Sequence, residues 1–146
     1  MWLSVIIWNI ISKEREIMNE KELLKLASEA RKNSYSPYSK FRVGAALLTK
    51  SGKIYTGCNI ENATYGATCC AERTAIYKAI SEGEKEFEAI AVQGDNDGLT
   101  FPCGICRQVM SEFSPNIQIV LGDNDGNIKR FELEQLLPHA FYKQDS

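Results

Sequence analysis

Three cysteines and one glutamate in this chain have the types and the spacing that metal chemistry requires. Cys103 and Cys106 are separated by two residues, the spacing at which two thiolates can bind one tetrahedral Zn²⁺, and Cys70 can supply a third sulfur. Three protein ligands leave the fourth position open for water, as in catalytic zinc sites. Glu72 follows Cys70 by two residues, so its carboxylate can face that water and carry protons without binding the metal. The spacing therefore predicts one catalytic Zn²⁺ per chain and a hydrolytic reaction.

Other interpretations of the cysteines stay open at this stage. Cys58 or Cys69 could serve as a fourth ligand, which would exclude water and make the zinc structural. Cys69 is adjacent to Cys70, and the spacing to Glu72 is what favours Cys70 as the ligand. The C-x-x-C pair could instead be a redox-active dithiol, but that role would need neither a C-A-E segment nor a metal.

The charge of three thiolates requires a positive partner, because it outweighs the charge of Zn²⁺ and weakens its Lewis acidity. Arg73 is expected to donate hydrogen bonds to the ligand sulfurs and to hold them in place. The alternative is an arginine solvated on a helix surface. Both cysteine segments also lie where a loop meets the start of an expected helix, and free backbone N–H groups there stabilise thiolates.

Length and composition restrict the class of protein. The 146 residues suffice for one domain with a buried core, and 17 basic against 19 acidic residues give a formal net charge of −2. No basic patch favours a nucleic-acid polymer, so a small molecule is the expected partner. Five cysteines, an odd number with three in metal-binding spacing, indicate a reducing compartment and therefore the cytoplasm, not a disulfide framework.

The N-terminal residues differ in composition from the rest of the chain. Residues 1–11 are apolar, but this run is well short of the ~20 residues of a membrane-spanning helix, and no basic segment precedes it. We therefore expect no membrane association. Residues 1–17 are predicted to be an extension of unknown role, and residues 18–146 to be a single zinc-dependent domain.

The apolar periodicity predicts alternating helices and strands. Asn19 is the expected N-cap of a helix that stops at residues 33–37, and a turn at 50–52 joins two antiparallel strands. Residues 95–98 are expected to form a turn that could border the mouth of a pocket. The other segments are expected to be helical at 70–80, 103–113 and 133–137 and extended at 41–49, 53–60, 89–93, 117–121 and 127–131. A hairpin followed by helix–strand units predicts an α/β three-layer sandwich, a mixed five-stranded sheet with helices on both faces.

The segments around the cysteines resemble those of a known family. C-A-E at 70–72 followed by P-C-G-I-C-R-Q at 102–108 is similar to the motifs of the cytidine deaminases, and the resemblance continues at 41–47, 57–63 and 136–138. It is closest to the short, single-domain members, which assemble as homotetramers. The resemblance implies hydrolytic deamination of cytidine and deoxycytidine to uridine and deoxyuridine, as in pyrimidine salvage, with zinc-bound hydroxide as nucleophile and Glu72 moving the protons. A deaminase of another cytosine-containing nucleoside would share the same zinc core.

Two polar residues are expected to select the sugar of the substrate. Asn59 and Glu61 are two apart in an extended segment, so their side chains should point the same way and can grip vicinal hydroxyls. The resemblance assigns both to the ribose 3′-hydroxyl. A carboxylate at this place would repel a phosphate, which favours a nucleoside over a nucleotide.

The resemblance also assigns contacts with the base and between subunits. It implies that Phe41 packs against the base with Val43 beside it, although burial in the core is the alternative for Phe41. The backbone of Ala71 would bind the amine or carbonyl edge of the base. Phe141 would come from a neighbouring subunit of the homotetramer to complete the pocket, and Arg73 would support the ligand sulfurs.

Overall fold

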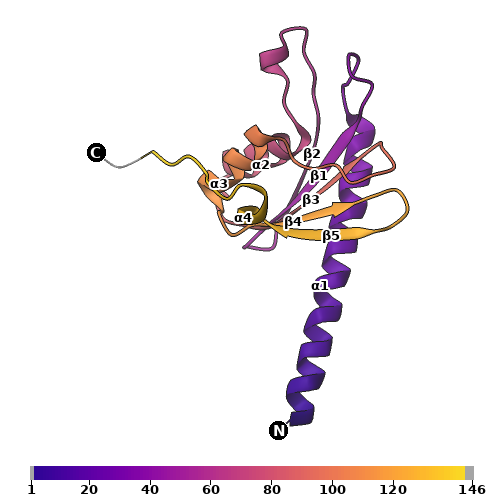
Figure 1. Ribbon diagram of the computed structural model, residues 1–146, viewed down its shortest axis with the longest axis vertical. Coiled ribbons are helices and arrows are strands. Elements are labelled where there is room, and N and C mark those ends of the chain that lie inside the picture. The colour runs from indigo at the N-terminus through magenta and orange to yellow at the C-terminus, as the bar shows by residue number, and fades with distance from the viewer. Residues whose placement is uncertain (1, 144–146) are drawn as a thin grey trace.

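The structure of the chain, a computed structural model, describes residues 2–143 and has a five-stranded sheet at its centre (Figure 1). The strands lie in the order β2-β1-β3-β4-β5, with bounds β1 Val43–Thr49, β2 Ile54–Cys58, β3 Phe87–Gly94, β4 Gln118–Gly122 and β5 Ile128–Glu132. Strands β3 and β4 are parallel, and the other neighbouring pairs are antiparallel. The sheet is therefore mixed, as predicted, and every strand agrees with its predicted range to within two residues.

Helices cover both faces of the sheet. Their bounds are α1 Trp2–Ala30, α2 Ala71–Ser81, α3 Gly104–Phe113 and α4 Leu133–Leu136, with 3₁₀ turns η1 Arg31–Asn33 and η2 Tyr65–Ala67. Successive strand residues point to opposite faces. Ala46 and Ala91 therefore pack with α1 on one face, whereas Leu47 and Ile90 pack with α2 and α3 on the other. The predicted three-layer sandwich is confirmed.

Small residues let the C-terminal half of α1 lie very close to the sheet. Leu23, Leu24 and Ala27 are at most 7% exposed and pack against alanines of β1 and β3. A Cβ atom on Gly44 of β1 would lie 1.8 Å from the carbonyl oxygen of Ala27, so only glycine fits at this crossing.

The start of α1 differs from the prediction. The helix runs from Trp2 to Ala30 without a break, because residues 2–30 contain no proline or glycine to interrupt it. Asn19 lies inside the helix, so the predicted N-cap there is wrong. Residues 2–15, which we call the N-terminal arm, project beyond the sheet (Figure 1). None of the helices in the described part of the chain combines the length and the hydropathy that a membrane-spanning segment needs.

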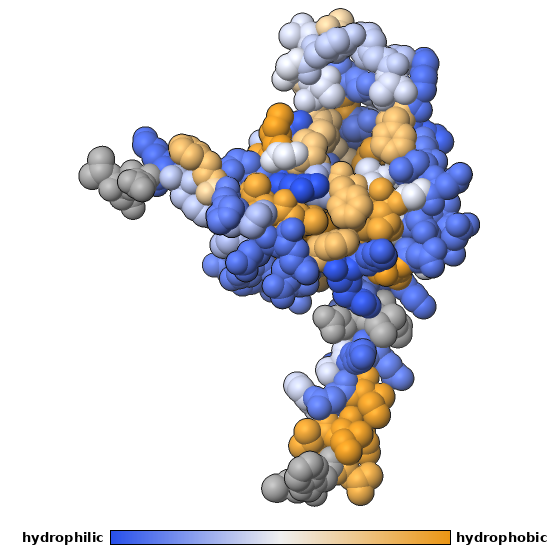
Figure 2. Space-filling view, viewed as in Figure 1, coloured by the Kyte–Doolittle hydropathy of each residue, from blue (hydrophilic) through white to orange (hydrophobic). Residues whose placement is uncertain are grey.

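The surface of the N-terminal arm is largely apolar (Figure 2). Its large apolar side chains are between 47% and 76% exposed: Leu3, Val5, Ile6, Ile7, Trp8, Ile10 and Ile11. The arm is therefore part of a helix but not part of the core.

Candidate active site

The three predicted zinc ligands lie together at the starts of two helices. Cys70 and Cys103 are the N-cap residues of α2 and α3, and Cys106 lies in the first turn of α3. Their Sγ atoms are all within 4.8 Å of one another, and those of Cys70 and Cys103 are 3.6 Å apart. Because both helices pack on one face of the sheet, the positive ends of two helix dipoles lie beside the sulfur atoms.

This donor set fits Zn²⁺. Zn–S bonds of ~2.3 Å in a tetrahedral site place two sulfur atoms about 3.8 Å apart, close to the 3.6 Å between Cys70 and Cys103. Among the described residues, no fourth cysteine, histidine or carboxylate belongs to the group. Cys69 instead accepts a hydrogen bond from the Thr74 hydroxyl (3.6 Å). The geometry thus favours Cys70 over Cys69 and a site with three protein ligands over a closed structural site.

Hydrogen bonds between the thiols favour one thiolate before any metal binds. The neighbouring thiol of Cys106 lowers the pKa of the Cys70 thiol to about 5, with further help from Arg73 and against the effect of partial burial. The same hydrogen bond, together with burial, raises the pKa of Cys106. Cys70, at the start of α2, is therefore the thiol of the pair that ionises more readily.

Arg73 lies where a positive partner for the sulfur atoms was expected. Its Nη2 atom donates to Cys70 Sγ at 3.5 Å and to the carbonyl oxygen of Thr68 at 3.4 Å. Its Nε atom is buried and has no hydrogen-bond partner in the described part of the chain. Burial opposes the charge of Arg73, but hydrogen bonds with Cys70 and Cys106 outweigh it and raise its pKa. Arg73 is therefore a partner of the cysteines, not a solvated surface arginine.

Glu72 is buried beside the cysteines. The residue is 3% exposed, and Cys106 Sγ donates to its Oε2 atom over 3.6 Å. Burial raises the pKa of Glu72 to about 7. A buried carboxylate is rarely tolerated without a partner, so its place beside a group of thiols points to a chemical role.

One cavity joins the cysteines to most of the predicted substrate residues. It has a volume of about 280 Å³. The predicted residues that line it are Phe41, Val43, Asn59, Glu61, Cys70, Ala71, Glu72 and Cys103. They come from segments that are far apart in the sequence, and the fold places them around one space large enough for a small molecule.

Asn59 and Glu61 are both held in place by their own chain. The amide of Asn59 donates to the carbonyl oxygen of Phe41 (2.8 Å) and accepts from the N–H of Val43 (2.9 Å). The carboxylate of Glu61 accepts from the backbone N–H and the hydroxyl of Ser39, each at 3.1 Å. Both residues line the cavity, and these hydrogen bonds hold their side chains in place.

Phe141 does not line this cavity within the described chain. It is 76% exposed, and its backbone exchanges two hydrogen bonds with the side chain of Gln108 (2.7 and 3.2 Å). The contact with a neighbouring subunit stays a prediction.

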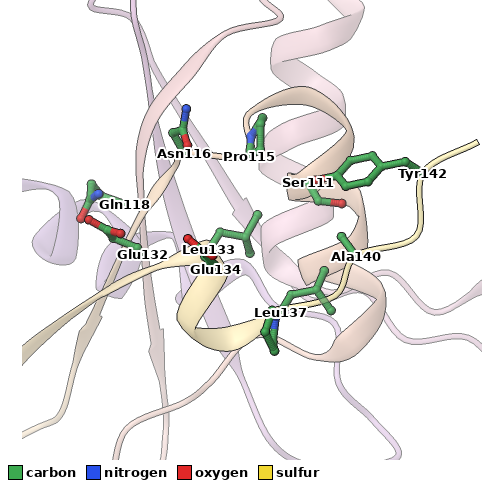
Figure 3. A pocket seen from close by; sticks show the side chains of 11 residues that line it. Ser111, Pro115, Asn116, Gln118, Glu132, Leu133, Glu134, Leu137, Ala140 and Tyr142 are labelled. Atoms are coloured by element: carbon green, nitrogen blue, oxygen red, sulfur yellow. The ribbon is translucent and has the colours of Figure 1, made fainter.

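A larger cavity of about 450 Å³ lies beside the C-terminal segment, where Tyr142 and Ala140 face the end of α3 (Figure 3). Its polar lining consists of Ser111, Asn116, Gln118, Glu132 and Glu134. In the described structure it includes neither the cysteines nor any other predicted site residue. Size alone therefore does not identify the active site, because the smaller cavity carries the metal-binding group.

The sequence analysis missed four residues of the smaller cavity: Ser39, Thr68, Thr100 and Phe101. The last two directly precede Pro102 and Cys103, so their distance from a ligand was a usable signal. Ser39 is placed by a hydrogen bond to Glu61 of another loop, and Thr68 by a hydrogen bond from Asn62 within its own loop; the spacing of residues in the sequence indicates neither contact.

Comparison with known proteins assigns the family. The model of the cytidine and deoxycytidylate deaminase zinc-binding region matches residues 17–122. The cytidine deaminases of Halalkalibacterium halodurans and Sporosarcina psychrophila are 50% and 48% identical over 129 residues, which cover 88% of this chain and 98% and 95% of theirs. The crystal structure of cytidine deaminase from Burkholderia pseudomallei has a TM-score of 0.79 at 48% identity, over 83% of this chain and 98% of that one. These matches confirm the resemblance and the expected metal, and the chain belongs to the zinc-binding cytidine and deoxycytidylate deaminase family.

Proposed function

We propose that this chain is a zinc-dependent hydrolase that deaminates cytidine and deoxycytidine. Water adds at C4 of the cytosine ring, the bond from C4 to the exocyclic amine breaks, and ammonia leaves, so the products are uridine and deoxyuridine. The observation that carries the proposal is the single cavity lined by Cys70, Cys103, Glu72, Asn59 and Glu61. The three relatives named above, which are cytidine deaminases, support it.

Four residues would build the metal centre. Cys70, Cys103 and Cys106 would hold the zinc ion, which when bound supplies a Lewis acid that activates water at neutral pH. Arg73 would offset the charge of the thiolates and orient Cys70 through its 3.5 Å hydrogen bond.

Glu72 would move the protons. It lines the cavity and lies 3.6 Å from the sulfur of Cys106, so its carboxylate is next to both the metal ligands and the space for the base. Hydrolysis requires one proton of water to reach ring N3 and the other to reach the departing amine. One carboxylate within reach of both places can carry the two protons in succession.

Asn59 and Glu61 would bind the sugar hydroxyls, with Phe41 against the base. The hydrogen bonds of Asn59 to the backbone at Phe41 and Val43 fix it relative to the aromatic wall. Such preorganisation lowers the entropy lost on binding. The negative charge of Glu61 would disfavour a phosphate, so we expect CMP to react far more slowly than cytidine.

We further propose a homotetramer in the cytoplasm. Phe141 is exposed in the single chain while Gln108 anchors its backbone, which suits a side chain offered to a neighbouring subunit. All five cysteines are unpaired thiols, as a reducing compartment requires. The family match begins at residue 17, which supports a catalytic domain at 18–146 preceded by an extension.

One experiment tests the catalytic proposal. Zinc content is measured for the wild type and for Glu72→Gln, and the ultraviolet absorbance change is then followed after addition of cytidine. We expect about one zinc per chain in both proteins and turnover lower by about 10²–10⁴-fold in the variant, the usual contribution of a general acid–base group. A fully active variant, or a wild type without zinc, would contradict the mechanism. Turnover of CMP at a rate comparable to cytidine would contradict the role of Glu61.

A further inference from the structure

The segment at residues 95–101, which lies between β3 and the Pro102–Cys103 dipeptide, forms part of the wall of the active-site cavity. It supplies Thr100 and Phe101 to the lining. The segment folds back over the end of β3 so tightly that a Cβ atom on Gly94 would lie 2.3 Å from Thr100 Oγ1 and 2.7 Å from Phe41 Cζ. The hydroxyl of Thr100 also donates to the side chain of Asn96 (3.0 Å), which closes the segment on itself.

Asp95, the first residue of this segment, joins it to β1. Its carboxylate accepts from Nε and Nη2 of Arg42 at 2.8 and 3.3 Å and from the N–H of Arg42 at 3.2 Å. The N–H of Asp95 in turn donates to the carbonyl oxygen of Arg42 (3.1 Å). Arg42 stands between Phe41 and Val43, which both line the cavity. The carboxylate therefore connects two segments that both contribute residues to the wall of the cavity.

A second arginine and an asparagine fix the other side of Asp95. Arg31 lies 3.7 Å from its carboxylate and donates to the carbonyl oxygen of Gly94. The amide of Asn124 donates to the carbonyl oxygens of Asp95 and Asn96 at 3.5 and 3.0 Å. The start of the segment is thus held from η1, from β1 and from the turn between β4 and β5.

The contacts of Asp95 are better suited to fixing the orientation of the two segments than to raising the free energy of unfolding. The Asp95 side chain is 24% exposed and that of Arg42 is 51% exposed, and ion pairs at such sites contribute little to the free energy of unfolding. A two-pronged contact between arginine and carboxylate nevertheless fixes relative orientation. Small displacements of binding groups weaken substrate binding.

We propose that Asp95 is a positioning residue that fixes Thr100 and Phe101 relative to Phe41 and Val43 in the wall of the substrate cavity. The inference rests on the proposed function, because it is this cavity that would hold the nucleoside. Asp95 does not line the cavity and acts only through these four residues.

The test compares Asp95→Asn with Asp97→Asn, the same change two residues along on an exposed residue of the same segment. Steady-state kinetics with cytidine, zinc content and melting temperature are measured for each protein. We expect Asp95→Asn to raise KM about tenfold with kcat within about twofold, since the wall is displaced while the metal ligands and Glu72 keep their places. Zinc content and melting temperature should stay close to those of the wild type, and Asp97→Asn should behave as the wild type.

A variant of Arg42, the partner of Asp95 in this contact, keeps the test valid even if Asp95→Asn folds poorly. Arg42→Gln should raise KM to a similar extent, and the double variant should be no worse than either single variant, because both remove the same contact. An unchanged KM in Asp95→Asn, or a loss of melting temperature and zinc in place of the KM effect, would overturn the inference while the proposed function stands. A wild type that does not act on cytidine would overturn the proposed function, and the inference with it.

Discussion

Two regions of the molecule differ in what fixes their structure. One is the pair of helix starts that carry the cysteines, and the other is the N-terminal arm. Cys70 and Cys103 are 33 residues apart in sequence, yet their sulfur atoms are 3.6 Å apart because α2 and α3 pack on the same face of the sheet. The arm is a continuous helix, yet Leu3 and Trp8 are 76% and 71% exposed. Long-range packing defines the first region, whereas helix continuity alone defines the second. Mutations should therefore have large effects in the first region and small ones in the second.

The largest effect is expected from removal of one sulfur of the metal group. Cys106 is fully buried and belongs to the group, so Cys106→Ser should lose most of its zinc and all detectable cytidine turnover. Cys58→Ser is the matched control, because Cys58 lies outside the group. Metal content and turnover are measured on both proteins. Equal zinc in the two variants would mean that the sulfur atoms do not hold the metal.

A smaller loss of activity is expected when the sulfurs keep their places but lose their positive partner. Arg73→Gln removes the hydrogen bond to Cys70 Sγ, and a change of this kind beside metal ligands typically costs about 10–100-fold in activity or metal affinity. The measurements are kcat/KM for cytidine and the rate at which a chelator removes zinc. An unchanged rate of zinc loss together with unchanged kcat/KM would place Arg73 outside the metal centre.

The sequence predicted the elements that have strong local signals and the site residues that lie on them. Cys70 and Cys103 sit at helix starts, and both the spacing to Glu72 and the two-residue gap to Cys106 could be recognised without coordinates. The strands were predicted because apolar runs and turns mark them. Gly52, with a φ of 91°, lies in the turn between β1 and β2, where the turn was expected.

Other features depend on contacts that no local pattern encodes. Ser39 lines the cavity and is bound to Glu61, 22 residues along the chain, and the Asp95–Arg42 contact links residues 53 apart. The predicted helix start at Asn19 was wrong for a related reason. A side chain that can cap a helix does so only where the chain leaves the helix, and nothing in residues 2–18 forces it to leave.

The two halves of α1 allow the same substitution to be compared in both surroundings. Leu24→Ala lies in the packed half, at 7% exposure, and should lower the free energy of unfolding by about 2–5 kcal/mol. Leu3→Ala lies in the N-terminal arm, at 76% exposure, and should change it by less than about 0.5 kcal/mol. Denaturant unfolding of the two variants measures the difference. Similar losses would show that the arm is packed against protein in solution.

The smallest effect on catalysis is expected from removal of the whole arm. None of residues 2–15 lines the active-site cavity in the described structure, and the family match begins only at residue 17. Deletion of residues 2–15 should therefore leave zinc content unchanged and kcat/KM for cytidine within about twofold. It should also weaken retention on a hydrophobic-interaction column, because it removes the exposed isoleucines and Trp8. A loss of kcat/KM well beyond twofold in the deletion variant would mean that the arm supports the active protein. The contrast between the two regions would then no longer hold.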